Sequence, residues 1–302
     1  MTNSTQMALF AEEPELSADD PLELVRSADV IVLNSSGGKD SMAMMAYVVG
    51  LAAKVGALDR IVVVHCDLGR VEWEGTRELA ELHAQIYGLP FEVRSRQAGD
   101  LLDQVEERSM WPSADVRYCT AYHKRDLVRD LIRGLDRLYA RFWRRGIVLD
   151  CLGFRAAESS KRAKKEPLAQ DTALTTRGRS VFTWSPILDW SDVRVWQEIA
   201  NSGLPYSPVY DAGMSRLSCS FCVLASEADL VCAARLRPDM AQTYVELEAR
   251  IGHKFKAKLA MADIHAQAQE LGPVKNPARG AAMRRHLGDE VTDRYLSRIA
   301  LT

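Results

Sequence analysis

Residues 30–41 have the sequence VIVLNSSGGKDS. Its first four residues are apolar and mostly β-branched, which is typical of a buried strand. The apolar residues that follow Ser41 predict a helix that extends to Lys54. Between the strand and the helix stands a short polar turn that contains Gly37 and Gly38. The first question is what this turn holds.

The turn has the composition of a phosphate-binding loop. Glycine allows backbone N–H groups to approach oxygen atoms closely, and a helix N-terminus favours negative charge. Lys39 adds a positive charge, and Ser36 and Ser41 add hydroxyl donors. Asp40 is a candidate ligand of Mg2+, or alternatively a carboxylate that simply favours the start of a helix. An ordinary strand-to-helix turn is the alternative for the whole loop, and the Lys-Asp-Ser sequence disfavours it.

The composition is typical of a soluble globular protein of one large or two smaller domains. The chain has 302 residues, 47% of them hydrophobic, and a net charge of −2. No apolar run approaches the roughly 20 residues that span a bilayer, and no signal peptide is recognisable. We therefore expect a cytoplasmic protein that does not contact the membrane. Nucleic-acid binding would have to come from local basic patches, because the whole surface is not basic.

Strand-like and helix-like segments alternate along the chain. Strands are predicted at 30–33, 61–66, 91–94 and 147–152, and helices at 41–54, 72–87, 121–139 and 192–201. This alternation predicts an α/β fold with a doubly wound parallel sheet. We expect a mobile tail over 1–20, an α/β domain over 21–205, and a cysteine-containing, helix-rich region over 206–302.

Several polar residues follow the predicted strands, where open parallel sheets bind ligands. Asp67 is suited to a nucleotide hydroxyl or magnesium, and Arg155 to an anion; exposed surface positions are the alternative for both. Two basic groups are candidates for nucleic-acid phosphates or bases, with an ordinary solvated surface as the alternative. These are the run Lys161-Arg162-Ala163-Lys164-Lys165 and the cluster Arg141, Arg144 and Arg145 around Trp143.

The loop Ser36–Ser41 resembles the SGGxDS loop of the N-type ATP pyrophosphatases, the PP-loop family. Other segments then resemble the phosphoadenylyl-sulfate reductase-like branch, over roughly residues 28–225: His65-Cys66-Asp67, Arg117-Tyr118-Cys119-Thr120, Gly153-Phe154-Arg155 and Ser185-Pro186-Ile187. The resemblance implies an adenine nucleotide alpha-hydrolase-like fold and cleavage of ATP, with magnesium, between its α and β phosphates. It implies catalysis by Lys39, Asp40 and Arg155. It also implies ATP binding by Ser36, Gly37, Gly38, Lys39, Asp40, Ser41, Asp67 and Gly153.

Four cysteines are candidate metal ligands. Cys219 and Cys222 have the spacing at which two thiolates bind one ion or cluster, and Cys232 follows ten residues later. In the resemblance, Cys119 occupies the position of a cysteine pair that holds a 4Fe-4S cluster in iron–sulfur members; Thr120 replaces the second cysteine. DNA phosphorothioation ATP pyrophosphatases also have a CxxC with a further cysteine after it. We expect a 4Fe-4S cluster held by Cys119, Cys219, Cys222 and Cys232, with zinc, or unliganded or redox-active cysteines, as the alternatives.

The other two cysteines, Cys66 and Cys151, lie at strand ends and are interpreted as packing residues; a sulfur-carrying thiol is the alternative. No cysteine follows Cys232. Sulfonucleotide reductases need a nucleophilic cysteine in the C-terminal tail, so the resemblance does not extend to that reaction unless Cys66 or Cys151 replaces it.

The leading functional hypothesis is an enzyme that binds Mg–ATP, activates a substrate by adenylylation and incorporates sulfur. The expected partners are ATP, a nucleic-acid or nucleotide substrate and a sulfur-donor protein such as a cysteine desulfurase, with a homodimer as one assembly. DNA phosphorothioation fits the cysteine pattern best, and tRNA thiolation is next. A sulfonucleotide reductase with an unusual thiol and a non-catalytic ATP-binding subunit are the rivals.

Overall fold

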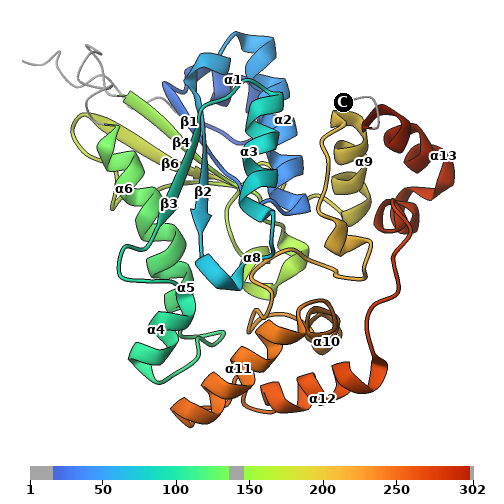
Figure 1. Cartoon of the computed structure of the whole chain (residues 1–302). Coiled ribbons are helices and arrows are strands. Elements are labelled where there is room, and N and C mark those ends of the chain that lie inside the picture. Colours follow the sequence, from blue (N-terminus) through green and yellow to red (C-terminus); the bar gives the residue numbers. More distant parts are fainter. Residues whose placement is uncertain (1–15, 136–145, 300–302) are drawn as a thin grey trace, which may run out of the picture.

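A six-stranded sheet forms the centre of the molecule in the computed structural model, which describes residues 16–135 and 146–299 (Figure 1). The strand order is β3-β2-β1-β4-β6-β5, and all neighbours are parallel except the last pair, β6 and β5. The strands are β1 (Val30–Asn34), β2 (Ile61–Asp67), β3 (Phe91–Ser95), β4 (Gly146–Leu152), β5 (Leu168–Gln170) and β6 (Arg179–Trp184). The order reverses between β1 and β4, so their carboxyl ends mark the expected ligand site.

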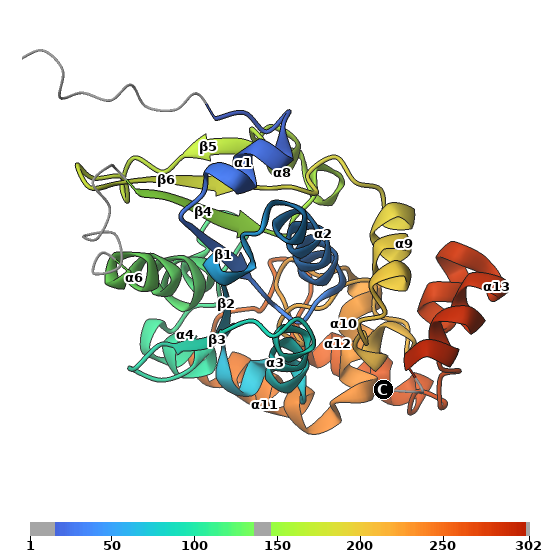
Figure 2. The same ribbon diagram turned by 90° about the horizontal axis from the view of Figure 1, so that it is seen from above.

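Helices cover both faces of the sheet (Figure 2). Ile31 and Leu33 point into the core shared with α1 (Pro21–Ser27) and α2 (Lys39–Val55). Val30 and Val32, one position away, pack with α6 (Asp126–Gly134) on the opposite face. α3 (Thr76–Ile86) lies on the α2 side. The predicted doubly wound α/β fold is therefore confirmed.

The four predicted strands correspond to β1–β4, whereas β5, β6 and α4 (Leu101–Arg108) were not predicted. The predicted helix 72–87 begins only at Thr76, because a 3-10 turn at Gly69–Val71 (η2) and a left-handed Gly75 precede it. The predicted helix 121–139 is a π-helical turn, η3 (Ala121–Arg125), continued by α6; its last residues lie outside the described chain.

The C-terminal part is helical, as expected. α10 (Glu227–Leu236), α11 (Pro238–Ile251) and α12 (Met261–Leu271) lie beneath the carboxyl ends of β1 and β2 (Figures 1 and 2). α13 (Ala281–Ile299), kinked at Gly288, packs on α9 (Asp192–Ser202). The remaining short elements are η1 (Leu58–Arg60), α5 (Tyr118–Thr120), η4 (Ala156–Glu158), α8 (Ser160–Ala163) and η5 (Pro208–Tyr210). No helix within 16–135 or 146–299 is long and apolar enough to cross a membrane.

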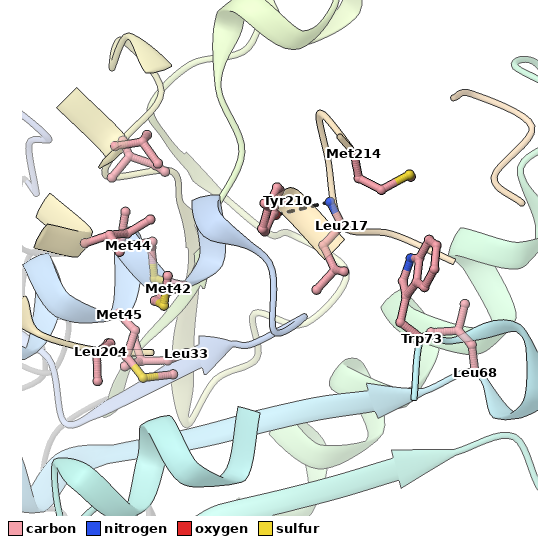
Figure 3. Close-up of a cluster of buried hydrophobic side chains, with 14 of the residues drawn as sticks. Leu33, Met42, Met44, Met45, Leu68, Trp73, Leu204, Tyr210, Met214 and Leu217 are labelled. Carbon is pink, nitrogen blue, oxygen red and sulfur yellow. Dashed lines mark hydrogen bonds between the residues drawn. The ribbon is translucent and has the colours of Figure 1, made fainter. Parts of the chain in front are cut away.

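One buried apolar cluster extends from Leu24 to Tyr295 and so joins the sheet to the C-terminal helices. Figure 3 shows its middle, where Leu33 and Met42 lie near Tyr210 and Leu217. Full burial of one such side chain contributes about 1.5–3 kcal/mol. The cluster therefore fixes the segment that contains Tyr210 and Leu217 against the loop between β1 and α2. The domain boundary at 205 stays a prediction, as does the tail, since residues 1–15 lie outside the described range.

Candidate functional site

The loop between β1 and α2 presents free backbone donors. Gly37 has a φ of +67°, and Gly38 is the N-cap residue of the 17-residue helix α2. The amides of these two glycines have no hydrogen-bond partner among the described residues. The Ser41 hydroxyl closes the loop: it accepts from the Ser36 amide at 3.2 Å and donates to the Gly38 carbonyl at 2.9 Å. Free amides at the start of a long helix form an anion-binding site.

Gly153 is placed against this loop by β4. A Cβ atom at Gly153 would lie 2.6 Å from the Ser41 Cα and 2.8 Å from the Asp40 carbonyl oxygen. Only glycine allows the two backbones to approach so closely. The structure therefore brings Gly153 to the loop as a close-approach residue.

The three predicted catalytic side chains meet beside the loop. Arg155 is 3% exposed, and its Nε donates to Asp40 Oδ1 at 2.6 Å. Lys39 Nζ lies 3.2 Å from Asp40 Oδ2, and Arg155 Nη2 lies 2.9 Å from Asp192 Oδ1. Burial opposes the charge on Arg155, but Asp40 and Asp192 hold its pKa above the ordinary value. Both Asp40 oxygens are paired with cations, so a magnesium ion would compete with Lys39 and Arg155 for them.

These side chains form one wall of a cavity of about 450 Å³. The other walls come from α9, from the segment after η5 and from α13. The lining residues are Lys39, Arg155, Ala157, Glu158, Asp192, Trp196, Tyr210, Gly213, Met214, Ser215, Arg216, Ala282, Arg285 and His286. A volume of this size lies within the range of small-molecule and nucleotide sites.

Tyr210 links the loop to the segment that covers it. Its hydroxyl oxygen accepts from the Lys39 amide at 2.9 Å. It also accepts from the Leu217 amide at 3.1 Å (Figure 3). Burial raises the pKa of Tyr210 well above its ordinary value, so the hydroxyl stays protonated. Leu217 is two residues before Cys219, so this hydroxyl ties the start of α2 to the segment that carries the CxxC.

Asp67 ends β2 at the expected edge of the sheet. Its carboxylate accepts from the Gly69 amide at 2.8 Å, and it is not among the side chains that line the cavity. Nearby, the two ring nitrogens of buried His65 contact the Ser35 carbonyl at 3.0 Å and Glu72 Oε2 at 3.1 Å. The ring therefore connects the start of the phosphate loop to the turn after β2.

Three of the four candidate metal-ligating cysteines are neighbours. A hydrogen bond from the Cys219 thiol to the Cys222 sulfur raises the pKa of Cys219 and lowers that of Cys222. Burial, followed by the nearby Cys222, raises the pKa of Cys119. The positive charge of Lys124 opposes the rise in the pKa of Cys119 and Cys219. Arg216 and Lys124 both contribute to the lowered pKa of Cys222. Soft sulfur donors of this kind suit zinc or an iron–sulfur cluster.

Cys232 is not with them. Its thiol donates to the Ala212 carbonyl at 3.4 Å, from a position on α10. Within 16–135 and 146–299, no three Cys, His, Asp or Glu side chains are arranged closely enough to hold a metal ion. Neither the predicted four-cysteine set nor the set of Cys119, Cys219 and Cys222 is therefore assembled as a metal site in the described structure.

Cys151 is buried and Cys66 is half-buried, and their packing roles stay a prediction. Cys151 is 0% exposed within the core. Burial raises the pKa of Cys66 to about 12 and that of Cys151 well above its ordinary value. Neither thiol is poised to act as a thiolate.

The predicted basic run at 161–165 does not line this cavity. Arg162 pairs with Glu158, and Lys161 Nζ lies 3.2 Å from Asp115 Oδ1. The cluster of Arg141, Trp143, Arg144 and Arg145 lies outside the described residues.

Sequence reasoning missed several residues that build the site. Asp229 is 4% exposed, and its two carboxylate oxygens accept from the Ser215 amide and hydroxyl, both at 2.7 Å. Arg237 donates to the Glu72 carbonyl and to the Ser220 hydroxyl, which holds the CxxC turn against η2. No local pattern marks these residues, because each acts across a long stretch of chain.

Related proteins are known for much of the chain. An uncharacterised protein of Methanocaldococcus jannaschii is 28% identical over 223 residues, which cover 72% of this chain and 47% of that protein. The chain spans about half the length, or less, of the curated relatives it matches.

Solved structures match at low identity. A phosphoadenylyl-sulfate reductase from Candida auris matches with 16% identity and a TM-score of 0.45, covering 68% of this chain and 89% of that one. A U34-tRNA thiolase from Methanococcus maripaludis, solved with its 4Fe-4S cluster, matches with 14% identity and a TM-score of 0.40, covering 84% and 78%. The model of the phosphoadenosine phosphosulfate reductase domain matches residues 30–225, about two thirds of the sequence, and the chain therefore belongs to that family.

Proposed function

We propose that this protein is an ATP pyrophosphatase-type enzyme that activates an acceptor oxygen by adenylylation so that sulfur can replace it. The observation that carries the proposal is the loop itself: unpartnered amides of Gly37 and Gly38 open the long helix α2, with Lys39, Asp40 and Arg155 beside them. Family membership supports ATP-dependent or nucleotide-dependent sulfur chemistry in general. The acceptor and the individual steps are the proposed part.

The chain's own residues suit the first step. The acceptor oxygen attacks the α-phosphorus of ATP, the bond from that phosphorus to the bridging α–β oxygen breaks, and pyrophosphate leaves with the electron pair. The loop amides and the positive end of α2 stabilise the negative charge on the leaving group. Arg155 orients Asp40, and the buried Lys39 adds positive charge to the cavity wall. Mg2+, when bound with ATP, neutralises phosphate charge. In the second step a sulfide donor attacks the activated carbon or phosphorus, and AMP leaves.

The thiols of Cys119, Cys219 and Cys222 are the proposed site of a 4Fe-4S cluster, with zinc as the alternative. Thiolate sulfur is a suitable ligand for both the cluster and zinc. The positive charge of Lys124, which acts on all three thiols, favours an anionic sulfur species beside them. Cys232, whose thiol bonds to the Ala212 carbonyl, is the fourth ligand that the cysteine pattern adds, and the thiols would have to move closer together to hold either group. DNA phosphorothioation stays the preferred acceptor reaction, with tRNA thiolation next. A cysteine desulfurase is the proposed sulfur donor.

The test is pyrophosphate release from Mg–ATP by anaerobically purified protein, with DNA, tRNA or no acceptor present. We expect release that depends on one acceptor and is lost in Arg155→Ala. Arg294→Ala, an exposed arginine of α13, is the matched control and should retain activity. Tight ATP binding without pyrophosphate release under any of these conditions would contradict the enzyme proposal and leave a nucleotide-binding subunit.

A further inference from the structure

Arg216 carries a positive charge close to the Cys222 thiol, whose pKa it lowers. It lines the cavity, and its buried Nε has no hydrogen-bond partner among the residues that the structure describes. No carboxylate in the described parts of the chain forms an ion pair with it. A guanidinium nitrogen shielded from water and left unpaired is unfavourable by itself. Its position is stable when a ligand supplies the missing acceptor.

The position of Arg216 is fixed by its surroundings. The preceding residue, Ser215, is held by two hydrogen bonds to the buried Asp229, and the following residue, Leu217, is held by Tyr210. The backbone on both sides of Arg216 is therefore tied to α10 and to the start of α2. Such anchoring presents the guanidinium to the cavity without a large loss of entropy on binding.

The other cations of the cavity fall into two groups. Lys39 and Arg155 are neutralised by Asp40 and Asp192. Arg285, from α13, gives one N–H to the Tyr210 carbonyl at 2.8 Å, and within 16–135 and 146–299 it has no carboxylate partner. Glu158 also lines the cavity, but its carboxylate accepts from Arg162 and from the Arg155 amide. Arg216 and Arg285 are thus the two cavity cations that no carboxylate within 16–135 or 146–299 neutralises.

An aromatic surface lies next to these arginines. The ring of His286 stacks on Trp196, with centroids 5.6 Å apart and planes 19° from parallel. Trp196 is buried whereas His286 is exposed, so the outer face of the imidazole faces solvent. Desolvation lowers the pKa of His286, which favours the neutral ring at neutral pH. A flat neutral ring beside guanidinium groups is a stacking platform for a nucleobase.

We propose that this cavity binds one phosphodiester-linked nucleotide of the acceptor, with Arg216 and Arg285 on the phosphate oxygens and His286 stacked on the base. A guanidinium fork matches the two non-bridging oxygens of a phosphodiester. About 450 Å³ accommodates one nucleotide rather than a duplex, so the acceptor nucleotide enters unpaired. The inference rests on the proposed function, in which the loop amides take the phosphates of ATP. It also gives α13, which lies beyond the family-matched residues 30–225, a role in acceptor selection.

The probe is fluorescein-labelled thymidylyl-thymidine, dTpT, titrated by anisotropy into protein saturated with Mg2+ and α,β-methylene-ATP. We expect Arg216→Gln to weaken dTpT binding about tenfold or more, as for loss of a charge-assisted hydrogen bond. Arg285→Gln should also weaken it, and Arg216→Lys should be intermediate because the charge is kept and the fork is lost. Arg294→Gln is the matched control, since that arginine lies on the same helix but pairs with Glu290. Thermal unfolding checks that each variant is folded.

The inference would be overturned by no dTpT binding to the wild type, by equal dTpT binding to Arg216→Gln, or by displacement of dTpT by the ATP analogue. Inorganic phosphate that competes as well as dTpT would reduce the site to a simple anion site and would also overturn it. A failure of the ATP analogue to bind, with Arg216-dependent dTpT binding retained, would contradict the proposed function but not this site. The two proposals therefore fail separately.

Discussion

Gly153 lies so close to Ser41 that a Cβ atom would be 2.6 Å from the Ser41 Cα. This contact joins the end of β4 directly to the first turn of α2. Arg155 follows two residues later and reaches Asp40 in the same turn. The separation between the phosphate loop and its arginine is therefore set by two backbones in contact, and not by flexible side chains.

Substitution of Gly153 tests this contact. The added methyl group of Gly153→Ala must push the backbone of α2 away, because the atoms it meets are main-chain atoms. We expect a loss of about 1–3 kcal/mol in the free energy of unfolding and at least about tenfold weaker ATP binding. Urea unfolding and calorimetric titration with the non-hydrolysable analogue measure the two effects.

Gly50 provides the matched control in the same helix. Nothing lies within 4 Å of the position that a Cβ atom would take there, so Gly50→Ala adds a methyl group in open space. Because alanine favours a helix interior, this variant should gain about 0.5–1 kcal/mol and bind the analogue normally. Equal behaviour of the two variants would show that the close approach of Gly153 is unimportant.

Tyr210→Phe removes one oxygen that serves two buried amides. The Lys39 and Leu217 N–H groups would both lose their acceptor. We expect a loss of about 1–3 kcal/mol in unfolding free energy and weaker analogue binding, since the start of α2 and its covering segment separate. Tyr122→Phe, at an exposed position, is the control. Wild-type stability in Tyr210→Phe would mean that water replaces the hydroxyl without cost.

Arg155→Lys keeps the positive charge but loses the planar guanidinium group with its several N–H donors. Arg155 uses three separate nitrogens to reach Asp40, the Trp190 carbonyl and Asp192, and a lysine ammonium cannot span these acceptors. We expect pyrophosphate release to fall about tenfold to a hundredfold with the fold retained. Arg194→Lys, an exposed neighbour over the Trp190 ring, should be near wild type. An unchanged rate of pyrophosphate release in Arg155→Lys would show that only the positive charge of Arg155 matters, and not its three hydrogen bonds.

The structure and the cysteine pattern predict different metal ligands. The neighbouring thiols are Cys119, Cys219 and Cys222, whereas Cys232 bonds to the Ala212 carbonyl. We therefore expect Cys219→Ala to lose iron and acid-labile sulfide, or zinc, and Cys232→Ala to retain them. Elemental analysis of anaerobically purified variants measures this. If Cys232→Ala lost as much iron and sulfide, or zinc, as Cys219→Ala, Cys232 would be the fourth ligand. The Cys232 thiol would then have to leave the Ala212 carbonyl.

The sequence could predict what is encoded locally. Val30 to Leu33 and the glycines after them specify a strand, a turn and a helix by short-range preference, and Gly153 and Arg155 follow a recognisable buried strand. β6 escaped prediction because half of its six residues are polar, and because its partner β5 has only three residues. Tyr210 escaped because its contacts join segments far apart: Tyr210 and Lys39 are separated by 171 positions. Arg216 escaped because the cavity that it lines forms only when distant segments pack together.

The pH dependence of stability provides the last test, at His123 in the π-helical turn η3. This ring is 0% exposed, its Nε2 lies 2.9 Å from Gln104 Oε1, and its Nδ1 is buried without a partner. Burial, followed by the charge of Arg96, lowers the pKa of His123 from 6.5 to about 4. Between these values the unfolded chain binds a proton that the folded chain does not. The free energy of unfolding therefore falls as the pH falls from about 6.5 toward 4, by at most about 3 kcal/mol from this residue.

His123→Gln keeps a donor to Gln104 but cannot titrate. Urea unfolding at pH 7.5, 6.0 and 4.5 should show a smaller loss of stability for His123→Gln than for the wild type at the lower pH values. His253→Gln, at an exposed position, should follow the wild type throughout. Parallel curves for His123→Gln and the wild type would mean that the buried ring accepts its proton without unfolding, through an opening of the π-helical turn that follows Cys119.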